Sequence, residues 1–208
     1  MADIRKDLSR FRFLKKLLLL KIYRNVKAPK FVKMNIIEKL KEKSEKLKER
    51  SLFREKATKE QIKHLEVSLN IELPQIMKSF YSTFNGGCFT DNSWCKKDLL
   101  NLEEHETIIW NSNYFLSIEE LINTYNFDGP FTSIDFQEQE KATNKKLIPL
   151  IHTKGQENLV WDATNKTETK ILDAFHEVNA DEWNVLFSTF EDLLTAYIDT
   201  EGDIETIS

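Results

Sequence analysis

The sequence predicts an α+β fold, in which a small, mostly antiparallel sheet packs against several helices behind a helical N-terminal extension. In residues 57–200, stretches with apolar residues at helical spacing begin with Ser or Thr followed three residues later by Gln or Glu, a pattern that starts helices. Short apolar runs bounded by turn residues lie between them and indicate strands. The first 56 residues repeat the helical spacing with many basic residues, which indicates a separate helical extension.

The stretch Leu73–Gly87 is the predicted centre of this fold. Pro74 starts a helix there, because its missing N–H would be unpaired in the first turn anyway. The apolar and aromatic face of this helix consists of Ile76, Met77, Phe80, Tyr81 and Phe84. Asn85, Gly86 and Gly87 are predicted to end the helix as a C-cap, because Asn and Gly accept a left-handed backbone.

The other elements follow from the same patterns. Capping boxes predict helices at Thr58/Gln61, Ser117/Glu120 and Ser188/Glu191, the last opening a closing helix over 187–197. Strands are predicted over 107–110, 114–116, 147–151, 158–162 and 170–175. Pro149 indicates an edge position or a bulge in its strand. Residues 126–146 have the polar composition of an insertion, and the acidic tail, residues 201–208, is expected to fray.

The charge is divided between the two ends of the chain. Residues 1–60 hold 20 Lys+Arg and 8 Asp+Glu, a net +12, whereas residues 61–208 hold 10 and 26, a net −16. Such asymmetry indicates a partner or self-association. The basic extension, residues 1–56, is expected to pack on the acidic domain, with peripheral membrane contact through residues 1–33 as the alternative. Met34 is an alternative translation start, which would make residues 1–33 an added arm.

Several short motifs occur in a set order along the domain. They are a helix containing Glu66 and Leu69, then Leu73-Pro74, an aromatic helix with Phe80 and Tyr81, Asn85-Gly86-Gly87, YFLSIEEL, LIPL, LVWD and STFEDLL. In this order they resemble the SUKH superfamily (the Smi/Knr-like domain) over about residues 57–200. The resemblance implies a binding scaffold without a catalytic residue, as in bacterial immunity proteins and regulators of fungal cell-wall synthesis. It assigns structural roles to Glu66, Leu73, Pro74, Phe80, Asn85, Gly86, Gly87 and Trp161.

A long polar stretch after Gly87 contains the first candidates for partner binding. Long loops in compact domains are often functional, and a Trp among charged residues suits an interface. The candidate residues are Asp91, Trp94, Glu103, Glu104 and Glu106, with Asp162 after the strand LVWD as a further carboxylate. The alternatives are that Trp94 covers the edge of the core and that Asp162 hydrogen-bonds the backbone of a turn.

The sequence contains no pattern for catalysis, a cofactor or a metal. No nucleophile elbow, phosphate-binding loop, dinucleotide fingerprint or HExxH motif occurs. The run Glu103–Glu106 contains His105, but neighbouring residues cannot all point at one ion. Cys88 and Cys95 are predicted to be free thiols in a reducing, cytoplasmic compartment, with a Cys88–Cys95 bridge as the alternative. No run of 18 apolar residues occurs, so we expect no transmembrane helix.

The predicted function is therefore protein binding without enzymatic activity. The leading hypothesis, which follows from the resemblance, is an immunity protein that neutralises a basic toxin domain. The −16 charge of the domain supports it, because such a surface attracts a basic partner. The alternative is a regulatory scaffold of the cell-wall type, and a third hypothesis is membrane recruitment through residues 1–33. No nucleic-acid partner is expected, since the basic residues lack stacking aromatic companions and the acidic domain would repel phosphate.

Overall fold

The computed structural model describes residues 35–91 and 109–204, which form the α+β fold predicted from the sequence. The described helices are α2 (Ile36–Lys46), α3 (Lys59–Leu69), α4 (Gln75–Tyr81), α6 (Ile118–Tyr125), α7 (Phe136–Thr143) and α8 (Phe190–Asp199). The strands are β1 (Tyr114–Phe115), β2 (Leu147–His152), β3 (Asn158–Asp162), β4 (Ile171–Ala174) and β5 (Asn184–Phe187). They form one antiparallel sheet in the order β1-β2-β3-β4-β5.

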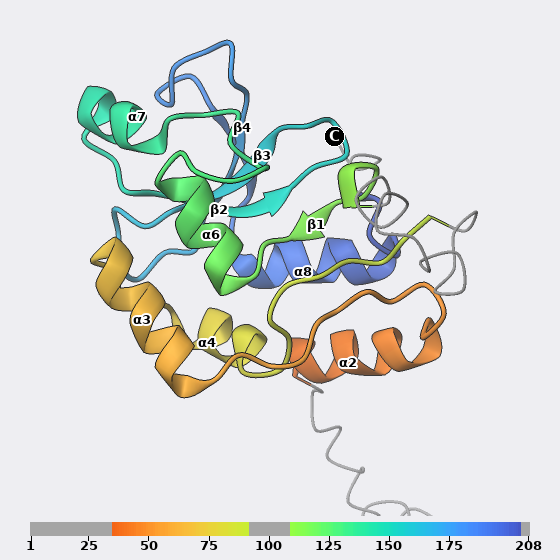
Figure 1. The fold of residues 1–208 in the computed structure, drawn as a ribbon. Coiled ribbons are helices and arrows are strands. Elements are labelled where there is room, and N and C mark those ends of the chain that lie inside the picture. Colours follow the sequence, from red (N-terminus) through yellow and green to blue (C-terminus); the bar gives the residue numbers. More distant parts are fainter. Residues whose placement is uncertain (1–34, 92–108, 205–208) are drawn as a thin grey trace, which may run out of the picture. The chain divides into compact units, whose positions relative to one another are not determined.

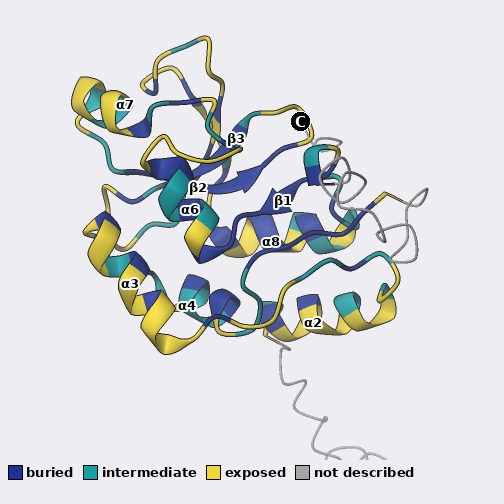
Figure 2. Cartoon of the chain, viewed as in Figure 1, coloured by how far each residue is buried: buried dark blue, intermediate teal, exposed yellow. Residues whose placement is uncertain are grey.

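The sheet supplies the centre of the hydrophobic core. Figure 2 shows buried residues along the strands, while the helices present one buried and one exposed face. An aromatic cluster joins the helices to β1. Phe80 of α4 lies 4.8 Å from Phe115 and 5.8 Å from Phe190 between ring centroids, and Tyr197 lies 4.9 Å from Phe115. This packing explains why the aromatic face predicted for the central helix is buried.

Two of the three predicted capping boxes are confirmed. The Thr58 and Ser117 side chains accept from the backbone N–H groups three residues later. The Gln61 and Glu120 side chains in turn accept from the backbone N–H groups of Thr58 and Ser117. The third box is wrong, because the closing helix begins one residue later with Thr189 as N-cap, which accepts from Asp192 N. Phe187 cannot belong to that helix because it is the last residue of β5.

The predicted role of Asn85-Gly86-Gly87 as a helix C-cap is also wrong. Helix α4 ends at Tyr81, several residues earlier. The side chain of Asn85 instead accepts from the N–H of Ile118, the first residue of α6, at 3.0 Å. A Cβ on Gly87 would lie 2.4 Å from the Cα of Phe53, so this glycine permits two backbone segments to approach each other.

Most predicted strands are confirmed with small changes of boundary. The strands predicted over 114–116, 147–151, 158–162 and 170–175 correspond to β1, β2, β3 and β4. The register shift between Pro149 and Ile151 is the predicted bulge, and β2 is an internal strand rather than an edge. The predicted strand 107–110 is wrong where the structure describes it, because Ile109 and Trp110 are helical. The sequence prediction missed β5 and placed α7 in a polar insertion.

Helix α2 and the residues after α8 are part of the same core. Figure 1 shows α2 beside α8, and Ile37 and Leu40 of α2 are buried. The expected fraying of the tail is wrong for residues 201–204, because Glu201 binds Lys43 of α2 and Ile204 is buried. None of the helices in residues 35–91 and 109–204 is long and apolar enough to cross a membrane.

Candidate partner-binding site

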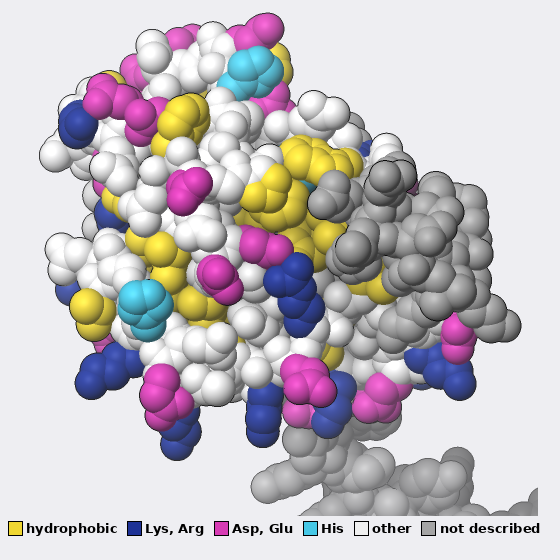
Figure 3. All heavy atoms as spheres, viewed as in Figure 1, with side chains coloured by type: hydrophobic (Ala, Val, Ile, Leu, Met, Phe, Trp, Pro, Cys, Tyr) yellow, Lys and Arg dark blue, Asp and Glu magenta, His cyan; other side chains and the backbone are white. Residues whose placement is uncertain are grey.

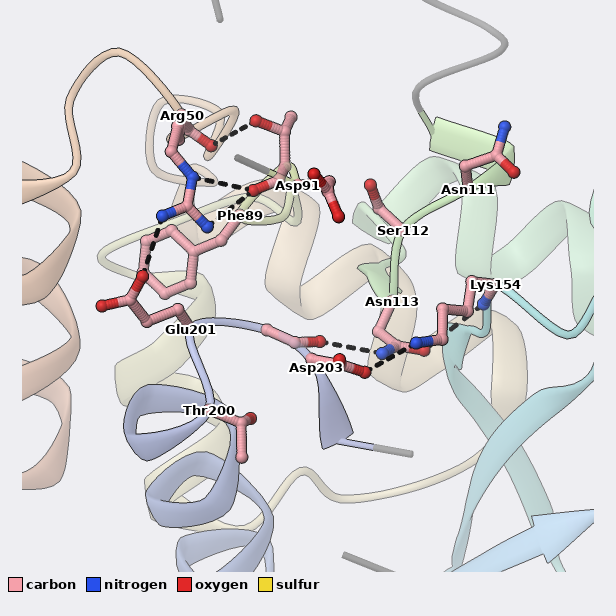
Figure 4. Close-up of a pocket in the computed structure, with 12 residues that line it drawn as sticks. Arg50, Phe89, Asp91, Asn111, Ser112, Asn113, Lys154, Thr200, Glu201 and Asp203 are labelled. Carbon is pink, nitrogen blue, oxygen red and sulfur yellow. Dashed lines mark hydrogen bonds and ion pairs between the residues drawn. The ribbon is translucent and has the colours of Figure 1, made fainter. Parts of the chain in front are cut away.

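A polar cleft of about 190 Å³ lies where several segments meet (Figure 4). It is lined by residues 89–91, 111–113 and 200–203, together with Arg50 and Lys154. Asp91 directly precedes the segment 92–108 in the sequence, and Asn111 follows it after two described residues, so residues near both borders of this segment line the cleft.

Arg50 and Glu201 form one wall of the cleft. The Arg50 guanidinium donates to the carbonyl of Thr90 through Nε at 3.0 Å and Nη2 at 2.9 Å, and to Glu201 Oε2 at 2.8 Å. Lys43 of α2 donates to the other carboxylate oxygen of Glu201 at 2.7 Å. Hydrogen bonds from Lys43 and then Arg50 lower the pKa of Glu201 below its ordinary value.

The opposite wall is formed around Asn113. The Asn113 side-chain amide donates to the carbonyl of Gly202 at 2.8 Å, and the Asn113 backbone carbonyl accepts from the hydroxyl of Tyr197 at 3.0 Å. Lys154 pairs with Asp203 at 2.6 Å. These contacts hold the residues after α8 against the segments before β1 and after β2. Several polar groups of the cleft therefore stabilise the fold.

The predicted partner-binding residues are not gathered into one site by the described structure. Asp91 lines the cleft, whereas Asp162 does not and accepts a turn hydrogen bond from Thr164 N at 3.0 Å. Trp94, Glu103, Glu104 and Glu106 lie outside the described residues.

A second surface, which the sequence prediction missed, lies along β4 and β5. We call it the β5 margin, defined by Glu157 and Asp173, which line a hollow of about 180 Å³, together with the exposed Phe175 and Val185. Val185 pairs with Leu172 and therefore lies on the other face of the sheet from Asp173. Glu157 Oε1 lies 2.5 Å from His176 Nδ1, and Oε2 accepts from His176 N at 3.2 Å. Burial, and then the Glu157 carboxylate, raise the pKa of Asp173 above its ordinary value.

The two surfaces belong to a domain whose sequence matches a known family model. The SMI1 / KNR4 family (SUKH-1) model matches residues 56–196 of the 208. The chain belongs to this family. No curated protein matches the sequence significantly. SUKH proteins are commonly toxin-immunity proteins and are generally not catalytic.

In this SUKH-1 protein the residues of the family motifs hold the helices against the sheet. Glu66 accepts from Leu73 N and pairs with Lys78, both at 2.9 Å, which joins α3 to α4. Pro74 is the N-cap of α4, and Phe80 lies fully in the core. Trp161 is 1% exposed and donates from Nε1 to the carbonyl of Glu168 at 3.1 Å. The buried Phe80 and Trp161 are therefore unsuited to contact a partner directly.

The described residues of the SUKH-1 protein include one cysteine, Cys88, which is buried. No cluster of three or more His, Cys, Asp or Glu able to hold a metal occurs among the described residues. Burial raises the pKa of the Cys88 thiol to about 12, so it is not a thiolate near neutral pH.

His152 is the one described residue whose buried polar atoms have no hydrogen-bond partner among the described residues. It is 2% exposed, and its ring packs beside those of Trp110 and Phe131, at centroid distances of 4.7 and 5.0 Å. Burial lowers the pKa of His152 to about 4, so the ring is neutral at ordinary pH.

Proposed function

We propose that this SUKH-1 protein is a non-enzymatic, cytoplasmic protein binder, and specifically an immunity protein that neutralises a basic toxin domain. The observation that carries this proposal is the charge of the sheet half of the domain. Residues 109–204 contain 18 Asp+Glu and only 6 Lys, with no Arg, a net −12. A surface of this charge attracts a basic partner, raises the association rate and resembles the phosphates that a nuclease binds.

Most of the few lysines of this half are paired within the domain, so the net negative charge comes from the carboxylates that remain. Four of them form ion pairs: Lys141 with Glu138, Lys146 with Glu140, Lys154 with Asp203 and Lys170 with Glu168. Lys145 donates to the carbonyl of Ala180 at 2.9 Å. Figure 3 shows charged groups of both signs on α2 and α3.

A second candidate function is a regulatory scaffold, recruited to membranes by the basic N-terminal residues. Residues 1–34 contain 11 Lys+Arg and 2 Asp, a composition that favours an anionic lipid surface or an acidic partner. The family match is equally compatible with a scaffold, because it also covers regulators of cell-wall synthesis.

The test is affinity purification from the source cell's lysate and secreted fraction, with the full chain and residues 34–208 as two baits. The immunity proposal predicts one stoichiometric partner with a toxin-like domain, whose toxic activity falls when this protein is added. A tight complex should bury about 1,200–2,000 Å². Several signalling or cell-wall partners would favour the scaffold instead. Co-sedimentation with phosphatidylserine vesicles only when residues 1–33 are present would favour membrane recruitment.

A further inference from the structure

The sheet ends in an open strand at β5. Within the described residues β5 pairs only with β4, and it is the last strand in the order of the sheet. No hydrogen bond joins the outer side of its backbone to another described residue. Half of the N–H and C=O groups of an edge strand point away from its neighbour and can pair with another chain. This edge can therefore accept an additional strand.

Two apolar side chains of this margin are exposed, one on β5 and one directly after β4. Val185 of β5 is 54% exposed, and Phe175, directly after β4, is 43% exposed. They are two of the four large apolar side chains that are exposed among the described residues. An open edge that also exposes apolar side chains offers a partner strand both backbone and side-chain contacts.

The hollow beside the edge has an apolar floor and an acidic rim. Leu159 and Ile204 are each 2% exposed and Leu186 is partly buried, whereas the rim carries the Glu157 and Asp173 carboxylates. At about 180 Å³ the hollow is smaller than the roughly 300–1,000 Å³ of sites for drug-sized ligands. It suits one long side chain with an apolar stem and a cationic end, which describes Lys and Arg.

The charges around β5 select the kind of chain that can pair with it. Before the strand come Glu177, Asp181 and Glu182, and soon after it come Glu191 and Asp192. None of these five forms an ion pair with a described residue. A second copy of this chain pairing edge to edge would bring these carboxylates together, and such like-charge contacts are destabilising. A basic strand would meet them favourably.

We propose that the β5 margin is the docking site for an extended, basic segment of a protein partner, which adds to the sheet beside β5 and places a Lys or Arg between Glu157 and Asp173. This proposal rests on the proposed function, because it names the surface through which the basic partner is held. Backbone pairing supplies the register, the apolar residues supply contact area, and the two carboxylates select a cationic side chain.

The direct test uses a short peptide of alternating Arg and Val as the probe and the ¹⁵N-labelled full chain as the receptor. Amide shifts should move at 173 and 184–187 on addition of this peptide. A Glu–Val peptide of the same length should leave these amides unchanged, and an Arg–Pro peptide, which lacks every second backbone N–H, should shift them less than the Arg–Val peptide does. No shift at about 1 mM Arg–Val peptide, or shifts confined to other strands, would overturn the proposal.

Two variants with the same net charge distinguish docking of the peptide at β5 from a general electrostatic attraction between the basic peptide and the acidic domain. Asp173→Lys should weaken the Arg–Val peptide about tenfold or more, whereas Asp128→Lys, at an exposed turn, should weaken it less than about threefold. Both variants change the net charge equally, and the dispersion of their amide spectra reports folding. Val185→Lys is a second variant, which should also weaken binding by removing the apolar contact. Equal weakening by Asp173→Lys and Asp128→Lys would contradict a local site.

The outcomes also distinguish this proposal from the immunity proposal. If a toxin is captured and Asp173→Lys binds it as well as Asp128→Lys does, the β5 margin is excluded while the immunity function stands. If no toxin is captured but the Arg–Val peptide docks on β5, the margin stands as a basic-strand site and the immunity function fails.

Discussion

The two ends of the sheet are built differently. At the β1 end the segment around Gly87 extends the hydrogen bonding of the sheet beyond β1. Gly87 and Phe115 form two backbone hydrogen bonds with each other, of 2.8 and 3.0 Å. The segment around Leu52 is hydrogen-bonded to the segment around Gly87 in the same way, since Leu52 N donates to the carbonyl of Cys88 at 2.8 Å. At the β5 end the described residues provide no such continuation.

This difference shows how one small sheet can be both stable and available for binding. The β1 end is covered by the segments 50–54 and 86–90, which α2 and α4 bring into place. The β5 end is short, acidic and open, and acidic flanks are one way in which proteins keep an open edge from pairing with itself. Substitutions at the β1 end should therefore cost stability, whereas substitutions at the β5 end should cost binding.

The largest expected effect is that of Gly87→Ala at the closed end. The added Cβ would lie 2.4 Å from Phe53 Cα and 2.5 Å from the carbonyl oxygen of Leu52, and Gly87 has a φ of +119°. Backbone strain and overpacking together should remove about 3–5 kcal/mol from the free energy of unfolding. Urea unfolding followed by circular dichroism measures this loss.

The matched control is Gly129→Ala, which also has a positive φ but whose Cβ would meet only the Cβ of Asn123 at 3.6 Å. Its loss should be about 1 kcal/mol, because only the backbone conformation is unfavourable. Equal losses at the two glycines would contradict the interpretation that Gly87 permits the close approach at the β1 end.

The next largest effect concerns His152, the last residue of β2, which pairs with Tyr114 of β1. Because burial lowers its folded pKa to about 4 from an ordinary 6.5, the unfolded chain binds the extra proton between these values. Stability from this group is present above pH 6.5 and is lost as the pH falls towards 4. We expect a loss of about 2 kcal/mol between pH 7 and pH 5.

His152→Phe should remove this part of the pH dependence, whereas His64→Gln, at an exposed position of α3, should retain it. The measurement is the free energy of unfolding of each variant at pH 7 and pH 5. If the free energy of unfolding changes by the same amount between pH 7 and pH 5 in the wild-type protein and in His152→Phe, His152 is not the responsible group.

A smaller effect is expected for Glu201→Gln, which weakens the contact of the tail with α2. Glu201 binds Lys43 and Arg50, but its side chain is 37% exposed, so the loss should be about 0.5–1 kcal/mol. Thermal unfolding at low and high salt measures it, and the difference from wild type should shrink at high salt. Glu138→Gln, which breaks the exposed pair with Lys141, is the control and should change nothing measurable.

The smallest effect on stability is expected at the open end, for Val185→Thr. Val185 is more than half exposed, so its replacement should change the free energy of unfolding by less than about 0.5 kcal/mol. The same variant should weaken the Arg–Val peptide, because the apolar contact is lost. A stability loss above about 1 kcal/mol would mean that the β5 end is a structural part of the core, and the contrast between the two ends would disappear.

Local patterns predicted much of the fold but could not distinguish all local solutions. The capping boxes at Thr58 and Ser117 depend on contacts within four residues, so the sequence was sufficient to find them. Asn85-Gly86-Gly87 fits a helix end as well as a close backbone approach, and only Phe53 and Phe115 beside it decide between the two. β5 was missed because it has four residues and leads directly into the apolar spacing of α8.

The candidate site was less predictable than the fold. Of the six residues proposed for partner binding, Asp91 lines the polar cleft, Asp162 makes a turn, and the remaining four lie outside the described residues. The hollow of the β5 margin was not found, because Glu157, Asp173, Leu186 and Ile204 come from four separate segments. No spacing along the chain brings such residues together.

The sequence by itself determined the fold class, the positions of most helices and strands, the family and the division of charge. These properties depend on periodicity, capping and composition, which are written in neighbouring residues. Only the tertiary structure decided which edge of the sheet is closed, why Gly87 is needed there, and where carboxylates and apolar side chains meet beside β5. Those features depend on the order of the strands and on contacts between residues distant in sequence, since side chains become neighbours in space only after the sheet has formed.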